Sequence, residues 1–107
     1  MKILGGRYKG QTIDTSKNIS YRPTQTRIRK SIFDIITPFT YSNVLDLYSG
    51  SGILGFESAS RGAESITFVE NNSASIKMLN RNKTKFNSPE FFVIKKKCFF
   101  LFKRFEQ

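Results

Sequence analysis

A chain of 107 residues has room for one modest domain and is short for a complete nucleotide-binding enzyme, whose sheet needs more strands and cover on both faces. A composition with 38% hydrophobic and 14% aromatic residues excludes a disordered tail and predicts a packed core. The net charge of +10 comes from two basic flanks, residues 1–30 and 76–107, around an acidic middle, which suits a polyanion such as RNA or a solvated basic face without a partner.

Residues 1–20 are rich in turn signals, because glycines separate several short apolar stretches. This pattern predicts a small β-hairpin with a bulge, which presents Lys2, Arg7 and Lys9 on its exposed side. A two-stranded ribbon is marginally stable by itself, so we expect it to lean on the following domain or to become ordered against a partner.

A helix is predicted over residues 24–37, after the extended Arg22-Pro23 step and before Pro38. Its isoleucines recur at helical spacing and predict one apolar stripe that faces the core; they are Ile28, Ile32, Ile35 and Ile36. Arg27, Lys30 and Asp34 are expected to point away from that stripe.

The remaining elements alternate between strands and helices. The predicted order is a strand over 43–47 buried on both faces, a turn and helix ending at Arg61, a strand over 65–70, a helix beginning near Ser73 with Asn72 as its cap, and a strand over 91–94. The tail Cys98 to Phe105 fits either a helix or a strand. Strand, helix, strand, helix, strand predicts an α/β fold with about three parallel strands and right-handed crossovers.

The turn after the first strand carries the chemistry. Gly50, Gly52 and Gly55 match G-x-G-x-x-G, and Glu70 ends the next strand, where a carboxylate can accept hydrogen bonds from both hydroxyls of a ribose. The same outline serves dinucleotides and S-adenosylmethionine. Asp46 separates the two, because an anion just before the turn repels a pyrophosphate but offsets the positive charge of a sulfonium. We therefore favour S-adenosylmethionine.

These stretches together resemble the bacterial 16S ribosomal RNA guanine-N2 methyltransferases. Three pieces carry the resemblance: the run from Lys2 to Gly10; Arg22-Pro23-Thr24 with Arg27, Arg29 and Phe33; and the run from Val44 to Gly52, which continues to Gly55-Phe56-Glu57 and Arg61-Gly62-Ala63. Phe68-Val69-Glu70 also fits, so the resemblance covers roughly residues 1–85.

The resemblance implies a partial Rossmann-like S-adenosylmethionine-dependent methyltransferase domain over residues 21–107, preceded by the basic hairpin of residues 1–20. The implied cofactor-binding residues are Asp46, Ser49, Gly50, Gly52, Gly55 and Glu70, with Glu70 at the ribose. The residues implied to face ribosomal RNA, or the small ribosomal subunit, are Lys2, Arg7, Lys9, Arg22, Thr24 and Arg27; for Arg27 and Arg29 a solvated helix face is the alternative.

The sequence departs from the family in two places. Lys97 stands near the position where the family has an acidic residue that meets the adenine. The family's catalytic Asp-Pro-Pro-Tyr is absent, since the prolines are Pro23, Pro38 and Pro89. We therefore expect no catalytic residue in this chain, an inactive enzyme when it is alone, and an open apolar edge along 43–47 that favours self-association. The alternatives are a basic RNA-binding remnant without catalysis and an NAD-binding oxidoreductase fragment.

The sequence also indicates the cellular compartment. Cys98 is the only cysteine, which excludes an internal disulfide and favours a reducing compartment. The longest strictly apolar run, Cys98 to Phe102, is far shorter than the roughly 20 residues that span a bilayer. The N-terminus lacks the apolar core of a signal peptide. We expect a cytoplasmic protein with no membrane partner and no metal.

Overall fold

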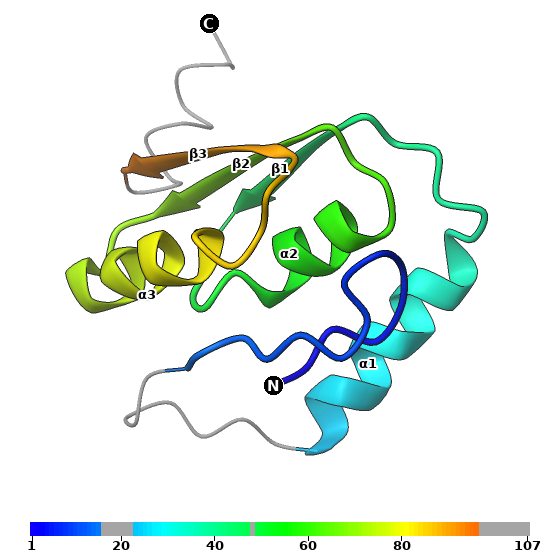
Figure 1. Cartoon of the computed structure of the whole chain (residues 1–107). Helices are drawn as coiled ribbons and strands as arrows, with labels where there is room; N and C mark the ends of the chain where they lie inside the picture. Colours follow the sequence, from blue (N-terminus) through cyan, green and yellow to red (C-terminus); the bar gives the residue numbers. More distant parts are fainter. Residues whose placement is uncertain (16–22, 48, 97–107) are drawn as a thin grey trace, which may run out of the picture.

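The computed structural model describes residues 1–15, 23–47 and 49–96. The elements in chain order are α1 (Pro23–Ile35), β1 (Asn43–Leu47), α2 (Ile53–Ser60), β2 (Ser65–Glu70), α3 (Ser73–Lys83) and β3 (Glu90–Lys95). The three strands form one parallel sheet in the order β1-β2-β3, and all three helices lie on the same side of it (Figure 1). The predicted α/β fold with three parallel strands is confirmed. Lys97 and the tail from Cys98 to Phe105 lie outside the described residues.

The register of the sheet gives each of its faces a different role. Val44 pairs with Ile66 and Ile66 with Phe91, and these side chains face the helices, where they pack with Phe56 and Phe68. Within the described residues no helix covers the other face, on which Leu45 and Phe92 are 55% and 49% exposed. The expectation that residues 43–47 are buried on both faces is therefore wrong, whereas in the part of the chain that the structure describes β1 does lie at an edge of the sheet, as expected.

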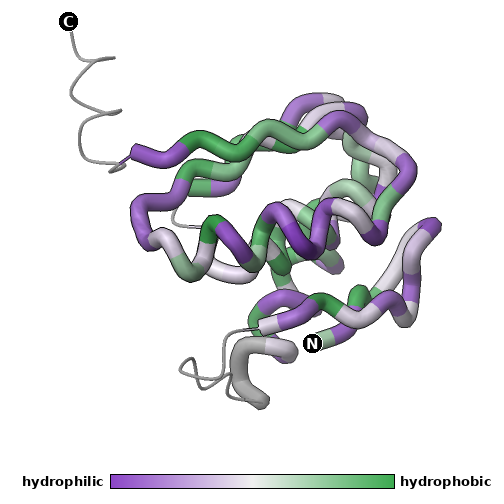
Figure 2. The backbone as a smooth tube through the Cα atoms, turned by 60° about the vertical axis from the view of Figure 1, so that its left-hand side comes forward, coloured by the Kyte–Doolittle hydropathy of each residue, from purple (hydrophilic) through white to green (hydrophobic). Residues whose placement is uncertain are grey.

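Residues 1–15 form a loop on the side of the helices that faces away from the sheet (Figure 2). In place of the predicted hairpin with two strands, the chain reverses direction and is closed by one isolated antiparallel β-bridge, between Lys2 and Thr12. The loop leans on the domain as expected, because Ile3 and Ile13 are almost completely buried in the same core as Phe56. Lys2 and Lys9 remain exposed.

The helix α1 presents a different face to the core from the one the isoleucines predict. Ile28, Ile32 and Ile35 are 58%, 39% and 80% exposed, whereas Arg29 and Phe33 are only 3% exposed. Arg29 and Phe33 are also one helical turn apart, and Arg29 gains hydrogen-bonding partners in the interior that an isoleucine could not use. The prediction of a buried isoleucine stripe is therefore wrong, and so is the alternative of a solvated Arg29.

A buried ionic cluster fastens the N-terminal loop to α2. Glu57, with no exposed surface, accepts hydrogen bonds from the backbone N–H groups of Leu4 and Gly5, and it pairs with Arg61 at 2.9 Å and with Arg29 at 3.6 Å. The Arg29 guanidinium also donates to the Lys2 carbonyl. A buried carboxylate is stable only when its charge and lone pairs are satisfied, as they are here.

Candidate cofactor-binding site

The residues predicted to bind a cofactor gather at the carboxyl end of the sheet, where β1 and β2 both end. Asp46 lies in β1, the turn of residues 49–52 follows, and Glu70 closes β2. In parallel sheets this edge is where ligands bind, because strand ends, turns and helix N-termini meet there. The structure thus brings Asp46, Gly50 and Glu70 together at one edge of the sheet.

The turn is fixed by two short hydrogen bonds, one from a side chain and one within the backbone. The Ser49 hydroxyl donates to the Asp46 carbonyl at 2.6 Å, and the Gly52 N–H donates to the Ser49 carbonyl at 2.8 Å. Gly50 and Gly52 have φ of 57° and 84°, in the left-handed region that favours glycine. The Ser49 hydroxyl thus holds the turn in shape.

The three glycines of the motif have different surroundings. A Cβ at Gly52 would lie 2.5 Å from a Leu79 methyl group, and a Cβ at Gly55 would lie 2.3 Å from the Phe68 ring. A Cβ at Gly50 would meet nothing within 4 Å. Gly52 and Gly55 therefore allow close packing inside the domain, and Gly50 alone borders open space at the strand end.

Glu70 joins the turn to the next helix. Its Oε1 accepts from the Gly50 N–H at 2.9 Å, and its Oε2 accepts from the N–H groups of Asn71 and Asn72, each at 2.8 Å. Burial acts to raise the pKa of Glu70, but these N–H groups outweigh it and hold the pKa below its ordinary value. Glu70 is therefore an ionised acceptor at neutral pH, with lone pairs left for hydroxyl donors.

Asp46 lies behind the turn in a different environment. It is 8% exposed, and its Oδ2 accepts from the Gly55 N–H at 3.2 Å. Burial raises the pKa of Asp46 to about 7; the Gly55 hydrogen bond opposes the rise and the negative charge of Glu70 adds to it. Near pH 7 the site thus combines one fixed anion, Glu70, with one carboxyl that ionises readily when a cation arrives.

The hydrogen bonds of the turn argue against a dinucleotide. A pyrophosphate needs the free N–H groups of the turn, but here the Gly50 and Gly55 N–H groups already bond to carboxylates. Two carboxyl groups beside the turn would also repel phosphate. The site suits a ligand with hydroxyl donors and positive charge.

Asn82 is a supporting residue that the sequence analysis missed. Its side chain has no exposed surface; it accepts from the Asp14 N–H and donates to the carbonyls of Asp14 and Ser51. It therefore links the N-terminal loop to the turn of residues 49–52 through α3. An asparagine one turn after Leu79 on the inward face of α3 was the signal that could have revealed it.

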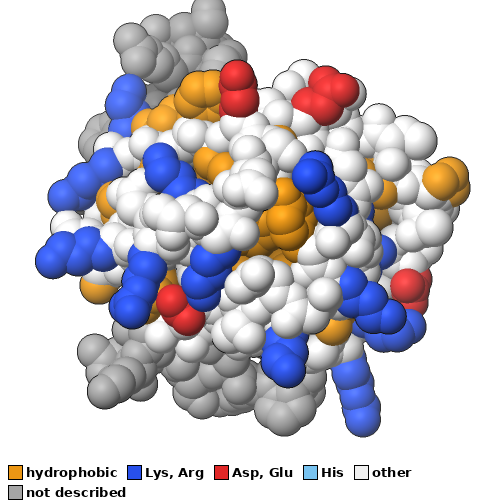
Figure 3. Space-filling view, in the orientation of Figure 1, with side chains coloured by type: hydrophobic (Ala, Val, Ile, Leu, Met, Phe, Trp, Pro, Cys, Tyr) orange, Lys and Arg blue, Asp and Glu red, His pale blue; other side chains and the backbone are white. Residues whose placement is uncertain are grey.

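The predicted RNA-facing residues are distributed more widely. Lys2, Arg7 and Lys9 are exposed on the N-terminal loop and Arg27 is exposed on α1. Arg22 lies outside the described residues, and for Thr24 the structure describes only the backbone, in the first turn of α1. Figure 3 shows Lys and Arg side chains scattered over the face in view rather than gathered in one patch.

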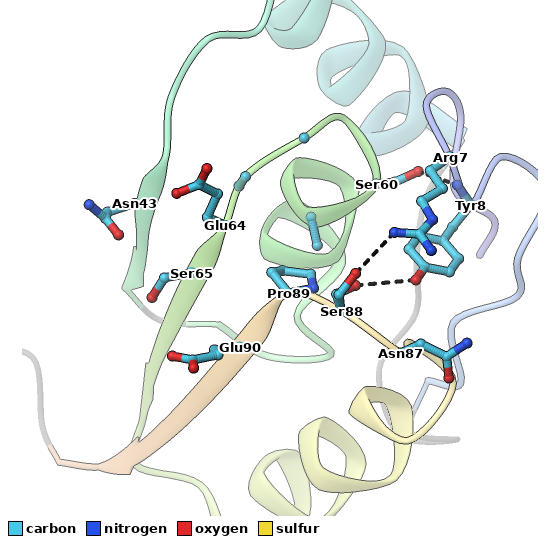
Figure 4. A pocket seen from close by; sticks show the side chains of 13 residues that line it. Arg7, Tyr8, Asn43, Ser60, Glu64, Ser65, Asn87, Ser88, Pro89 and Glu90 are labelled. Atoms are coloured by element: carbon cyan, nitrogen blue, oxygen red, sulfur yellow. Dashed lines mark hydrogen bonds between the residues drawn. The ribbon is translucent and has the colours of Figure 1, made fainter.

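A cavity of about 730 Å³ lies at the opposite edge of the sheet, where the strands begin. Figure 4 shows Asn43, Ser65 and Glu90, the first residues of the three strands, on one side of it. On the other side the Arg7 Nη1 donates to the Ser88 hydroxyl at 3.0 Å, and the Tyr8 hydroxyl donates to the Ser88 carbonyl at 3.3 Å (Figure 4). This cavity is therefore separate from the site of Asp46 and Glu70, which lies at the other end of the strands.

Among the described residues, no helix is long and apolar enough to cross a bilayer.

The comparisons with known proteins agree on one family. The family model described as "Conserved hypothetical protein 95" matches residues 1–105. An uncharacterised methylase of Rickettsia prowazekii is 39% identical, with 73% of this chain and 37% of the relative covered. The ribosomal RNA small subunit methyltransferase D of Escherichia coli K12 is 32% identical, with 77% of this chain and 42% of the relative covered.

Solved structures extend the agreement to the fold. A structure from Escherichia coli described as a methyltransferase matches with a TM-score of 0.84 at 27% identity, over 94% of this chain and 55% of that one. A hypothetical protein of Thermus thermophilus matches with a TM-score of 0.81 at 27% identity, over 97% of this chain and 60% of that one. The chain therefore has a Rossmann-like methyltransferase architecture, and it spans 37% to 60% of the length of these relatives and solved structures.

Proposed function

Because the chain belongs to the Conserved hypothetical protein 95 family and is similar to ribosomal RNA small subunit methyltransferases, we propose that it is the cofactor-binding part of such an enzyme. The reaction is methylation of guanine N2 in small-subunit ribosomal RNA, with S-adenosylmethionine as the methyl donor. The place of action is the cytoplasm, where its RNA substrate is found.

The arrangement of Gly50 and Glu70 carries this proposal. Open space borders Gly50 on the side where a Cβ would stand, and the Glu70 carboxylate is held beside it by three backbone N–H groups. Glu70 would accept hydrogen bonds from the ribose hydroxyls, and Asp46 would ionise in response to the cationic end of the cofactor. Bound S-adenosylmethionine would supply an electrophilic methyl group.

The acceptor side of the reaction is not built by the residues described between 1 and 96. Transfer to an exocyclic amine needs acceptors that hold the amino group in line with the methyl group and a surface that stacks the base. The sequence has no Asp-Pro-Pro-Tyr, and the polar side chains beside the turn, Asp46, Ser49 and Glu70, already bond to the turn. We propose that the chain binds the methyl donor and is inactive alone.

The N-terminal loop is the RNA-facing part of this proposal. Lys2, Arg7 and Lys9 are exposed on the loop, and the Glu57 and Asn82 contacts fix the loop to α2 and α3. Cations on a rigid support contact phosphates at a lower entropic cost than mobile ones. We include Arg22, Thr24 and Arg27 in the same RNA-facing set.

Calorimetric titration with S-adenosylhomocysteine tests the cofactor proposal, with NAD titrated in parallel. We expect heat with S-adenosylhomocysteine and none with NAD, and Glu70→Gln should weaken binding by roughly tenfold or more because a charged hydrogen bond is lost. Glu64→Gln is the matched control, since Glu64 is exposed just before the opposite end of β2. Heat with NAD alone would show a dinucleotide site, and RNA binding without cofactor heat would show an RNA-binding remnant.

A further inference from the structure

Asn82 is buried between two segments that lie far apart in the sequence. It lies on the inward face of α3, one turn after Leu79, and neither side chain has any exposed surface. Its partners are Asp14, which lies in the N-terminal loop, and Ser51, which lies in the turn of residues 49–52 after β1. A single side chain of α3 thus contacts both the loop and the turn.

The hydrogen bonds of Asn82 fix the loop and the turn relative to each other. Its Oδ1 accepts from the Asp14 N–H at 2.9 Å, and its Nδ2 donates to the Asp14 carbonyl at 2.9 Å and to the Ser51 carbonyl at 3.3 Å. A primary amide has two N–H donors, so Nδ2 can serve both carbonyls at once. A displacement of Asp14 therefore shifts the amide that holds Ser51.

The turn depends on this support at its centre. Among the described residues, Asn82 is the only hydrogen-bond partner of Ser51, which is 4% exposed. The residue before Ser51 is Gly50, whose N–H donates to the Glu70 carboxylate at 2.9 Å. The residue after it is Gly52, whose N–H closes the turn. A shift of Ser51 therefore changes the position of Gly50 relative to Glu70.

Lys85 holds the same end of the loop from the solvent side. Its Nζ lies 3.0 Å from the Asp14 carboxylate and donates to the Thr12 carbonyl at 2.9 Å. Within the described ranges, the Lys85 side chain bonds to the loop and not to the turn. Replacement of Lys85 therefore loosens the loop near Asp14 without removing a direct contact of the turn.

We infer that the N-terminal loop, through Asn82, holds the turn in the shape that binds the cofactor, which makes Asn82 a positioning residue for the cofactor site. Release of Asp14 from α3 lowers the affinity for the cofactor. Cofactor binding in turn protects the loop against local opening, because coupling between two sites is reciprocal. This inference rests on the proposed function for the identity of the cofactor, but not for the coupling of the loop to the turn.

Calorimetric titration with S-adenosylhomocysteine, combined with hydrogen exchange of the same full chain, tests this inference. Lys85→Met should weaken binding by roughly threefold or more although it alters only the loop, and Asn82→Leu should weaken it by roughly tenfold or more. Without ligand, both variants should speed exchange of the Gly52 amide, which donates to the Ser49 carbonyl. In the parent chain, the ligand should slow exchange of the Asp14 amide.

Two control variants separate positioning from general stability. Ser60→Ala removes a hydroxyl that accepts from the Tyr8 N–H and donates to the Gly5 carbonyl, so it loosens the loop at the carboxyl end of α2. It should lower the melting temperature and leave S-adenosylhomocysteine affinity and Gly52 exchange unchanged. Asn80→Ala, on the exposed side of α3, should change none of these quantities.

The outcomes distinguish this inference from the proposed function. If S-adenosylhomocysteine binds the parent chain and Lys85→Met changes neither affinity nor Gly52 exchange, the coupling is wrong and the proposed function stands. Equal losses of affinity in Lys85→Met and Ser60→Ala would also overturn the coupling, since general destabilisation would then explain both. If the parent chain does not bind the ligand but Gly52 exchange responds to Lys85→Met alone, the loop holds the turn and the proposed cofactor is wrong. If Asn82→Leu does not fold, the comparison of Lys85→Met with Ser60→Ala decides.

Discussion

Replacement of Asp46 by asparagine should make the domain more stable and make it a poorer cofactor-binding protein. Burial raises the pKa of Asp46 from 3.8 to about 7, so folding favours the protonated form of this side chain. The ionised form thus costs stability wherever the pH lies above the unfolded pKa. Asparagine presents a neutral oxygen to the Gly55 N–H and removes this cost.

The magnitude follows from the size of the shift. Each pKa unit corresponds to about 1.4 kcal/mol, so a shift of roughly three units corresponds to about 4 kcal/mol above pH 7. The penalty is absent below about pH 4, where Asp46 is protonated in both states, and it grows as the pH rises toward 7. Since small domains unfold with about 5 to 15 kcal/mol, this gain is large.

Urea unfolding followed by circular dichroism between pH 4 and pH 8 measures this effect. We expect Asp46→Asn to match the parent near pH 4 and to exceed it by up to about 4 kcal/mol at pH 8. Asp34→Asn on the exposed face of α1 is the matched control and should show no such trend. A difference that does not change with pH, or a variant that is less stable at pH 8, would refute the reasoning.

Three further predictions address the loop, the turn and the cations that we propose to face RNA. Glu57→Gln should lower the free energy of unfolding by about 3 to 5 kcal/mol, measured by urea unfolding, because it leaves buried arginine charge uncompensated. A decrease below about 1 kcal/mol would contradict the stabilising role of the ionic cluster around Glu57. Gly55→Ala should lower the melting temperature strongly through a clash with the Phe68 ring. Gly50→Ala meets no neighbour but has a left-handed φ of 57°, so it should cost only about 1 to 2 kcal/mol of stability and should also weaken S-adenosylhomocysteine binding; equal effects of the two variants on stability would contradict their separate roles. Replacing Lys2 and Lys9 by alanine should reduce the slope of log affinity for single-stranded RNA against log salt concentration by about 1.4. An unchanged slope would show that these two lysines do not contact RNA phosphates.

The strand, turn and helix of the site could be predicted because their signals are local. β1 and β2 have the predicted bounds of 43–47 and 65–70, and the Asn72 side chain accepts from the Ser75 N–H as a cap. Glycine spacing and the acid at the end of β2 then place Glu70 beside Gly50. A strand that leads directly into a glycine-rich turn allows the backbone few conformations, so the local sequence is enough to predict this part of the fold.

The orientation of α1 could not be predicted in the same way. Isoleucines and the pair formed by Arg29 and Phe33 both recur at helical spacing, and hydropathy alone ranks the isoleucines as the inward face. The choice depends on Glu57, which lies far along the sequence and offers Arg29 a buried anion. The role of Asn82 could not be predicted for the same reason, since its partners come from the N-terminal loop and the turn of residues 49–52.

The N-terminal loop also limits how this domain can be rearranged by evolution or by engineering. Ile3 and Ile13 are 2% and 1% exposed within the main core, although Lys2 and Lys9 between and beside them face solvent. Deletion of the loop would remove its exposed basic charge and open a cavity against Phe56 in the same step. Exchange of the loop between relatives therefore requires matched changes in α2 and α3, whereas single substitutions on its exposed side leave the core intact.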